Sequence, residues 1–143
     1  MARIILQFPD KVSFTTAITV RITDINYGGH LGNDKVLSLM HEVRMLWLQS
    51  IGYSELNIEG AGLIMADAGI QFKSEAFFGE VLTAEIAVAE ISRAGFNLYY
   101  RFKCAERVVA TGKTGMLFFD YSNRKIVSCP GAFIEKINAL NSL

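Results

Sequence analysis

A ten-residue stretch near the N-terminus gathers several side chains that could take part in catalysis. It holds a carboxylate, two amides, an imidazole and three glycines, in the order Asp24-x-Asn26-x-Gly28-Gly29-His30-x-Gly32-Asn33. Carboxylates and imidazoles transfer protons near neutral pH, and glycine lets the backbone approach a ligand closely. The stretch therefore indicates a ligand-binding loop in which Asp24 or His30 could act as a base.

This loop leads directly into a predicted helix over residues 34–51, with Asn33 as the expected N-cap and Gly52 as the expected stop. Apolar side chains recur at helical spacing on most of its surface. The exceptions form a narrow polar stripe: Ser38, His41, Glu42 and Gln49. We therefore expect a helix buried on most sides, with Glu42 as a second carboxylate that could act as a base.

The elements around this helix are expected to be strands. Residues 12–23 alternate between apolar and polar side chains, which is typical of a half-buried strand, and residues 3–8 are its expected partner. Further strands are expected at residues 62–73, 80–91, 96–104, 107–119 and 126–128, followed by a short amphipathic helix. This order predicts one α+β domain over residues 1–143, with an antiparallel sheet packed on one helix.

Composition excludes several classes of partner. Lys plus Arg and Asp plus Glu both count 14, so the zero net charge gives no general attraction to nucleic acid or to an anionic membrane. We expect no membrane span and no signal peptide, and we expect Cys104 and Cys129 to be free thiols in the cytoplasm. The two Cys and two His lack paired ligand spacing, so no metal site is predicted.

The motif resembles a known family, the hotdog-fold thioesterases related to 4-hydroxybenzoyl-CoA thioesterase. The likeness lies in three segments: Arg21-x-x-Asp24-x-Asn26-x-x-Gly29-His30-x-x-Asn33, then His41-Glu42-x-Arg44 on the helix, then Phe78-Gly79-Glu80. It covers nearly the whole chain. It implies an antiparallel sheet of five or six strands wrapped around one long central helix, and hydrolysis of an acyl-CoA or acyl-carrier thioester at a dimer interface.

The resemblance also implies a mode of substrate binding. The thioester carbonyl would point at the backbone N–H of Asn33 or a neighbour, where the helix dipole stabilises an oxyanion. Gly28 and Gly29 would shape the pocket. No cofactor is implied beyond the coenzyme A part of the substrate, and the expected protein partner is a second copy, as a dimer or a dimer of dimers.

The departure from the family lies at Asn26, where the family's catalytic carboxylate falls. An amide can neither attack a thioester nor activate water, although it could orient a water or bind the carbonyl. The candidate replacements are Asp24, Glu42, His30 and Asp67, a carboxylate that interrupts an apolar strand.

Other interpretations stay open at this point. Asp24 could simply pair with Arg21, and Asn26 could hold the loop by a local hydrogen bond. A hotdog hydratase or dehydratase would pair His30 with Glu42. A non-catalytic module that binds acyl-CoA or an acyl carrier would explain the amide at position 26.

Overall fold

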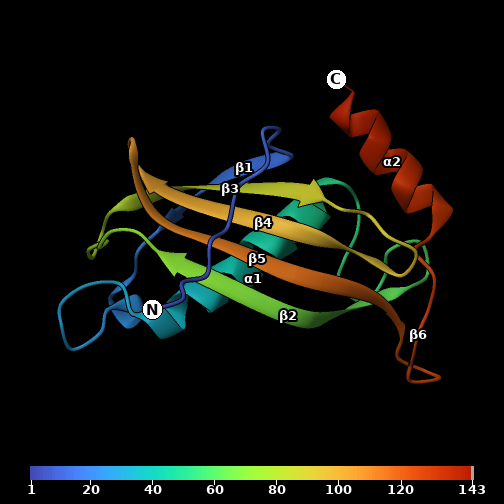
Figure 1. Cartoon of the computed structure of the whole chain (residues 1–143), viewed down its shortest axis with the longest axis horizontal. Coiled ribbons are helices and arrows are strands. Elements are labelled where there is room, and N and C mark those ends of the chain that lie inside the picture. Colours follow the sequence, from blue (N-terminus) through green and yellow to red (C-terminus); the bar gives the residue numbers. More distant parts are fainter. Residues whose placement is uncertain (143) are drawn as a thin grey trace.

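The structure is a computed structural model that describes residues 1–142, in which a six-stranded antiparallel sheet packs against one long helix (Figure 1). Along the chain the elements are β1 (Phe14–Thr19), the 3-10 helix η1 (Ile22–Asp24), α1 (Asn33–Ser50), β2 (Gly62–Phe72), β3 (Val81–Ala89), β4 (Gly95–Cys104), β5 (Arg107–Asp120), β6 (Lys125–Ile126) and α2 (Gly131–Asn141). The predicted α+β class is confirmed, and so is the predicted order of elements from the first strand onward. That strand is shorter than the expected 12–23, because residues 22–24 form η1.

The strands lie in the order β1-β3-β4-β5-β2, with β6 paired to the end of β5. The pairs β3–β4 and β4–β5 are hairpins, as predicted, and Ala105 has a positive φ of 53° in the second turn. In the described part of the chain, β2 pairs with β5 alone. It is therefore an edge strand along its whole length.

The core lies between α1 and one face of the sheet. The apolar stripe of α1 is buried as predicted, through Val36, Leu39, Met40, Val43, Trp47 and Leu48. A Cβ built on Gly112 of β5 would lie 2.7 Å from Met40, so the side of β5 that carries residue 112 faces the helix. At the far end Phe133 of α2 closes the core against Phe96 and Phe118, with ring centroids 5.1 and 5.3 Å away.

The sheet covers only one side of α1, so the helix is less enclosed than predicted. Leu37 and Met45 keep 38% and 40% of their surface exposed. The predicted polar stripe, which includes Glu42, is exposed. A single sheet can bury only one stripe of a helix, and nothing within residues 1–142 covers the other side.

The start of α1 differs from the prediction by one residue. Gly32 is the N-cap and Asn33 is the first helical residue, because the extended backbone ends at Gly32, with φ −72° and ψ 143°. Gly32 has no side chain, so no side-chain cap is made. At the other end Gly52 adopts a φ of +86°, which confirms the predicted glycine stop.

The predicted pairing of residues 3–8 with the first strand is wrong. β1 pairs with β3, and the N-terminal segment instead crosses the face of the sheet opposite α1 (Figure 1). The Leu6 N–H donates to Gln71 Oε1 at 3.3 Å, and the Arg101 guanidinium lies 4.2 Å from the Phe8 ring centre. Pro9 interrupts the chain after Phe8, so the segment does not run on into a hairpin with β1.

Cys104 and Cys129 are free thiols, as predicted. Within residues 1–142, no helix combines the length and apolar character needed to cross a membrane.

Candidate functional site

A cavity of about 800 Å³ opens where the loop before α1 meets the end of β2. Its polar lining includes Asn26, His30, Asn33, Lys73 and Glu75, and its apolar lining includes Tyr27, Val36, Phe72 and Val109. Both the size and the mixture of apolar walls with a few polar groups are typical of small-molecule sites. The loop, the helix start and the β2–β3 connection thus form one candidate site.

Asn26 holds the loop in shape. Its Oδ1 accepts the Gly28 N–H at 2.9 Å, and its own backbone N–H donates to the His30 carbonyl at 2.9 Å. The Gly29 N–H donates to the Asn26 carbonyl at 3.1 Å, and Gly29 has a φ of +83°, so it serves the turn and does not line the cavity. Within residues 1–142, no protein acceptor pairs with the Asn26 Nδ2 amide, which stays free to donate to a ligand.

Two glycines make room for polar groups in this loop. A Cβ on Gly28 would lie 3.2 Å from His30 Nε2, and a Cβ on Gly32 would lie 2.6 Å from Asp34 Oδ1. Because Gly32 provides no side-chain cap, the first N–H groups of α1, at Asn33 and Asp34, are not capped by it. Such groups can bind a partial negative charge at the cavity wall.

His30 lies beside a carboxylate that sequence reasoning did not single out. Its Nδ1 is 3.2 Å from the Leu31 carbonyl oxygen, and its Nε2 is 3.8 Å from Glu75 Oε1. The one signal in the sequence is the polar run Lys73-Ser74-Glu75 at the end of an apolar strand. Only the sheet pairing brings that run beside the loop.

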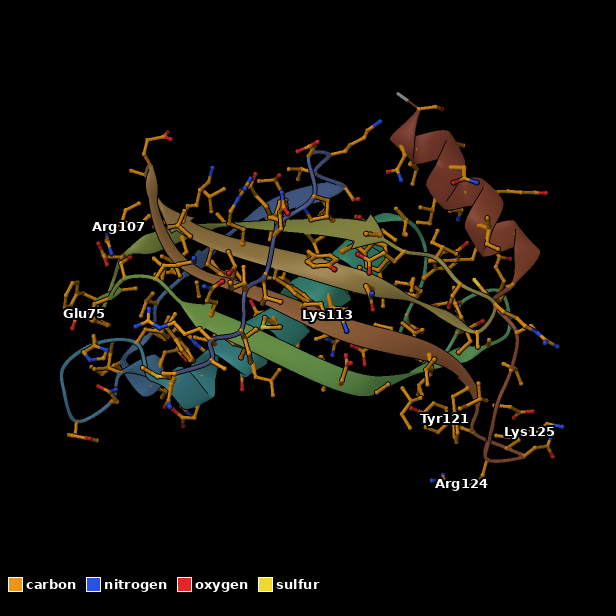
Figure 2. The ribbon with its side chains drawn as sticks, viewed as in Figure 1. Glu75, Arg107, Lys113, Tyr121, Arg124 and Lys125 are labelled. Carbon is orange, nitrogen blue, oxygen red and sulfur yellow. The ribbon has the colours of Figure 1, made fainter. Side chains whose placement is uncertain are left out.

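Arg107 at the start of β5 anchors the β2–β3 connection. Its guanidinium donates to the Glu75 carbonyl and pairs with Glu80 at 2.9 Å, and Figure 2 shows Glu75 and Arg107 at the same end of the molecule. The pKa of the Glu80 carboxyl lies below its usual range because the Phe77 N–H, with Cys104 and Arg107, binds the charged form. This connection is therefore held by charge as well as by backbone bonds.

Asp24 lies outside the cavity and is 3% exposed. Its Oδ2 accepts the Arg21 N–H at 2.9 Å, and its Oδ1 pairs with the Arg21 guanidinium at 3.3 Å. The hydrogen bond from the guanidinium to Asp24, together with the attraction of that carboxylate, raises the pKa of Arg21 above its ordinary value. Both carboxylate oxygens are thus engaged by Arg21, in agreement with the structural alternative for this residue.

Glu42 and Arg44 lie in different environments although they are only two positions apart in the sequence. Glu42 is exposed on α1 and does not line the cavity, so the structure does not bring it together with His30 there. Arg44 is buried and pairs with Glu55 at 3.0 Å. Within one chain, Glu42 and Arg44 therefore do not share a site.

Asp67 also lies away from the cavity. A register shift between Met65 and Asp67 turns Asp67 to the sheet face opposite α1, where it pairs with Lys113 of β5 at 2.7 Å. Figure 2 shows Lys113 over the middle of the sheet. The hydrogen bond from Lys113 holds the pKa of Asp67 below its ordinary value. Its Oδ1 also accepts the Gly115 N–H at 3.0 Å, so it ties the bulge to β5.

Residues 20–137 match a family model described as the thioesterase-like superfamily. The match covers far more than half of the chain and includes every candidate site residue. Comparison with the curated proteins gives no match.

Solved structures share this architecture over most of the chain. A 1,4-dihydroxy-2-naphthoyl-CoA thioesterase from Synechocystis has a TM-score of 0.78 and 25% identity, over 87% of this chain and 95% of that one. A gentisyl-coenzyme A thioesterase has a TM-score of 0.74 and 19% identity, over 89% and 98%. A protein from Thermus thermophilus has a TM-score of 0.77 and 22% identity, over 88% and 98%. The last two likenesses show the fold alone.

Proposed function

The chain belongs to the thioesterase-like superfamily, and we propose that it hydrolyses a thioester of coenzyme A or of an acyl carrier in the cavity at the start of α1. The observation that carries this proposal is the meeting of three groups around one cavity: the uncapped helix start, the Asn26 amide and the His30 imidazole. Together they can bind a carbonyl oxygen and move a proton, which is what thioester hydrolysis requires.

The carbonyl oxygen would be held by donors at the helix start. The N–H groups of Asn33 and Asp34 lie at the positive end of the helix dipole, and the Asn26 Nδ2 is a third donor on the same wall. Donors fixed in advance stabilise the negative charge that grows on this oxygen when water attacks. In this proposal Asn26 acts as a donor and takes no proton.

The acyl group would rest on the apolar wall formed by Tyr27, Val36, Phe72 and Val109. This wall suits an aliphatic chain as well as an aromatic ring. Two similar structures are named for aromatic acyl-CoA esters, so aromatic esters belong in any test. The reaction uses water and the groups of the chain, with no further cofactor.

We also propose that the working molecule contains a second copy of the chain. One side of β2 pairs with β5, and its other side has no strand partner within residues 1–142. On β2, Met65 and Phe72 are 40% and 55% exposed. Edge strands with apolar side chains are normally covered. Because Phe72 also lines the cavity, a copy paired along β2 would border the site.

The test is release of free thiol from purified short, long and aromatic acyl-CoA esters. The wild type should turn over at least one ester. Asn26→Ala should lower kcat by about 100-fold, as expected for the loss of one oxyanion donor. Asn123→Ala, in an exposed turn away from the cavity, is the matched control and should leave kcat unchanged.

One observation favours a second candidate, a non-catalytic acyl-CoA or acyl-carrier binder. The Asn26 Oδ1 is already engaged by the Gly28 N–H, and an amide is no base. This candidate predicts binding of acyl-CoA without turnover, and thiol release only after Asn26→Asp. That pair of results would contradict hydrolysis by the wild type.

A further inference from the structure

The imidazole of His30 is held in one orientation. When Nδ1–H donates to the Leu31 carbonyl at 3.2 Å, the lone pair of the neutral ring is on Nε2. Nε2 faces the carboxylate of Glu75 at 3.8 Å, across a gap at the cavity wall. A proton taken up at Nε2 would therefore create a positive charge directly beside a negative one.

The backbone fixes the relative position of these two residues. The Leu31 N–H donates to the Ala76 carbonyl at 2.7 Å, which joins the segment after His30 to the segment after Glu75. The Ser74 hydroxyl donates to the Val108 carbonyl at 2.7 Å, and Arg107 donates to the Glu75 carbonyl. Three hydrogen bonds that involve neither side chain thus hold the imidazole and the carboxylate opposite each other.

The other carboxylates considered are poorly placed to act. Asp24 is buried, with both oxygens bound by Arg21, and Glu42 is exposed on α1 outside the cavity. Asp67 lies on the opposite face of the sheet, paired with Lys113. Of the base candidates taken from the sequence, only His30 both lines the cavity and offers a free lone pair. The Asp34 carboxylate also lines the cavity, at the start of α1, but His30 is the group that faces a second carboxylate, Glu75.

We infer that His30 is the general base of this site and that Glu75 is a positioning residue that stabilises the protonated imidazole. This inference rests on the proposed thioester hydrolysis and assigns the proton transfer that Asn26 cannot perform. Neither the family model nor the names of the similar structures assign a role to Glu75.

The step balances with water as the only co-reactant. The water oxygen bonds to the thioester carbon while one water proton passes to His30 Nε2, and the carbonyl electron pair moves onto oxygen at the helix start. When the intermediate collapses, the C–S bond breaks and its electron pair leaves with sulfur. His30 returns the proton to sulfur, which gives a carboxylic acid and a free thiol and leaves His30 neutral beside the Glu75 carboxylate again.

The test compares kcat and KM for the wild type, His30→Gln and Glu75→Gln on the best ester of the panel. His30→Gln should lower kcat by about 100-fold or more. Glu75→Gln should lower kcat by about five- to tenfold, because the Coulomb attraction across an exposed gap of this length is modest. KM should change little in both. Glu106→Gln, an exposed carboxylate at the β4–β5 turn, is the matched control and should behave as wild type.

A rescue measurement separates chemistry from misfolding. Free imidazole should restore part of the lost rate to His30→Ala and none to Asn26→Ala, since only the former lacks the base. Wild-type kcat in both His30→Gln and Glu75→Gln would overturn the roles inferred for these two residues, while the proposed thioester hydrolysis would still hold. Loss in His30→Gln with wild-type kcat in Glu75→Gln would overturn the role of Glu75. Absence of turnover in the wild type would overturn the proposed function and, with it, the roles inferred for His30 and Glu75.

Discussion

At the scale of single residues, Arg44 on α1 is a cation buried outside the cavity, and a buried charge needs hydrogen-bond partners. Its Nε pairs with Glu55 at 3.0 Å, and its Nη1 donates to the Tyr100 hydroxyl at 3.1 Å. That hydroxyl also shares a 2.8 Å hydrogen bond with Thr114. Burial raises the pKa of Tyr100 above its ordinary value, so the hydroxyl stays neutral and keeps both partners. This chain of polar groups lets a charge sit in the core.

Tyr100→Phe should destabilise the fold by about 1–3 kcal/mol, because it leaves an Arg44 N–H and the buried Thr114 hydroxyl without a partner. Tyr99→Phe is the matched control. Its hydroxyl bonds Glu90 at the surface, so its loss should cost less than about 0.5 kcal/mol. Urea unfolding midpoints of the two variants would check this, and equal midpoints would contradict it.

At the scale of elements, the β3–β4 hairpin depends on a glycine where β4 begins. A Cβ built on Gly95 would lie 2.0 Å from the Met116 carbonyl oxygen of β5, which is backbone and cannot move aside cheaply. The Ser92 N–H, three residues earlier in the turn, donates to the Gly95 carbonyl at 2.8 Å. Close approach of two strands therefore requires the absence of a side chain here.

Gly95→Ala should lower the free energy of unfolding by about 1–3 kcal/mol through overpacking against β5. Gly131→Ala, at the start of α2, adds the same methyl group where nothing lies within 4 Å, and should be neutral or slightly stabilising. Thermal melts of both variants give the comparison. A melting temperature of Gly95→Ala equal to or above that of Gly131→Ala would contradict overpacking at Gly95.

At the scale of the whole molecule, one chain leaves apolar surface uncovered on two neighbouring features of the fold. Leu37 and Met45 are exposed on α1, and Met65 and Phe72 are exposed on the edge strand β2. Exposed apolar side chains on an edge strand are typical of an interaction surface. The fold therefore supports the proposed second copy, which would also complete the cover of α1.

Light scattering after size exclusion should give the mass of two or four chains at micromolar concentration. Met65→Lys should shift this mass toward one chain, because it places a charge in the proposed interface. Ile126→Lys is the control, since Ile126 is 55% exposed on β6 and away from the β2 edge. A monomeric wild type, or equal effects of both variants, would contradict assembly through β2.

Local patterns in the sequence were enough to predict the α+β class, the long helix with its glycine stop, and the two hairpins that join β3, β4 and β5. They did not predict that β2 pairs with β5 rather than with β3, the next strand along the chain. Alternation and helical spacing act within one element, so they can be read from neighbouring residues. The loop was identified in the same way, because its glycines, amides and imidazole are contiguous. Asn26, Gly28, His30 and Asn33 do meet at the cavity.

The sequence by itself thus determined the elements and one wall of the site, and the tertiary structure decided the rest. Residues 3–8 looked like a strand partner, but β3 occupies that edge of β1. The roles open to Asp24, Glu42 and Asp67 depend on which face of an element each side chain occupies, which a one-residue bulge can reverse. Glu75 reaches His30 across 44 intervening positions only because the fold carries the end of β2 to the loop, where the Leu31 N–H donates to the Ala76 carbonyl. Contacts of this kind are set by packing between distant segments, which no local pattern records.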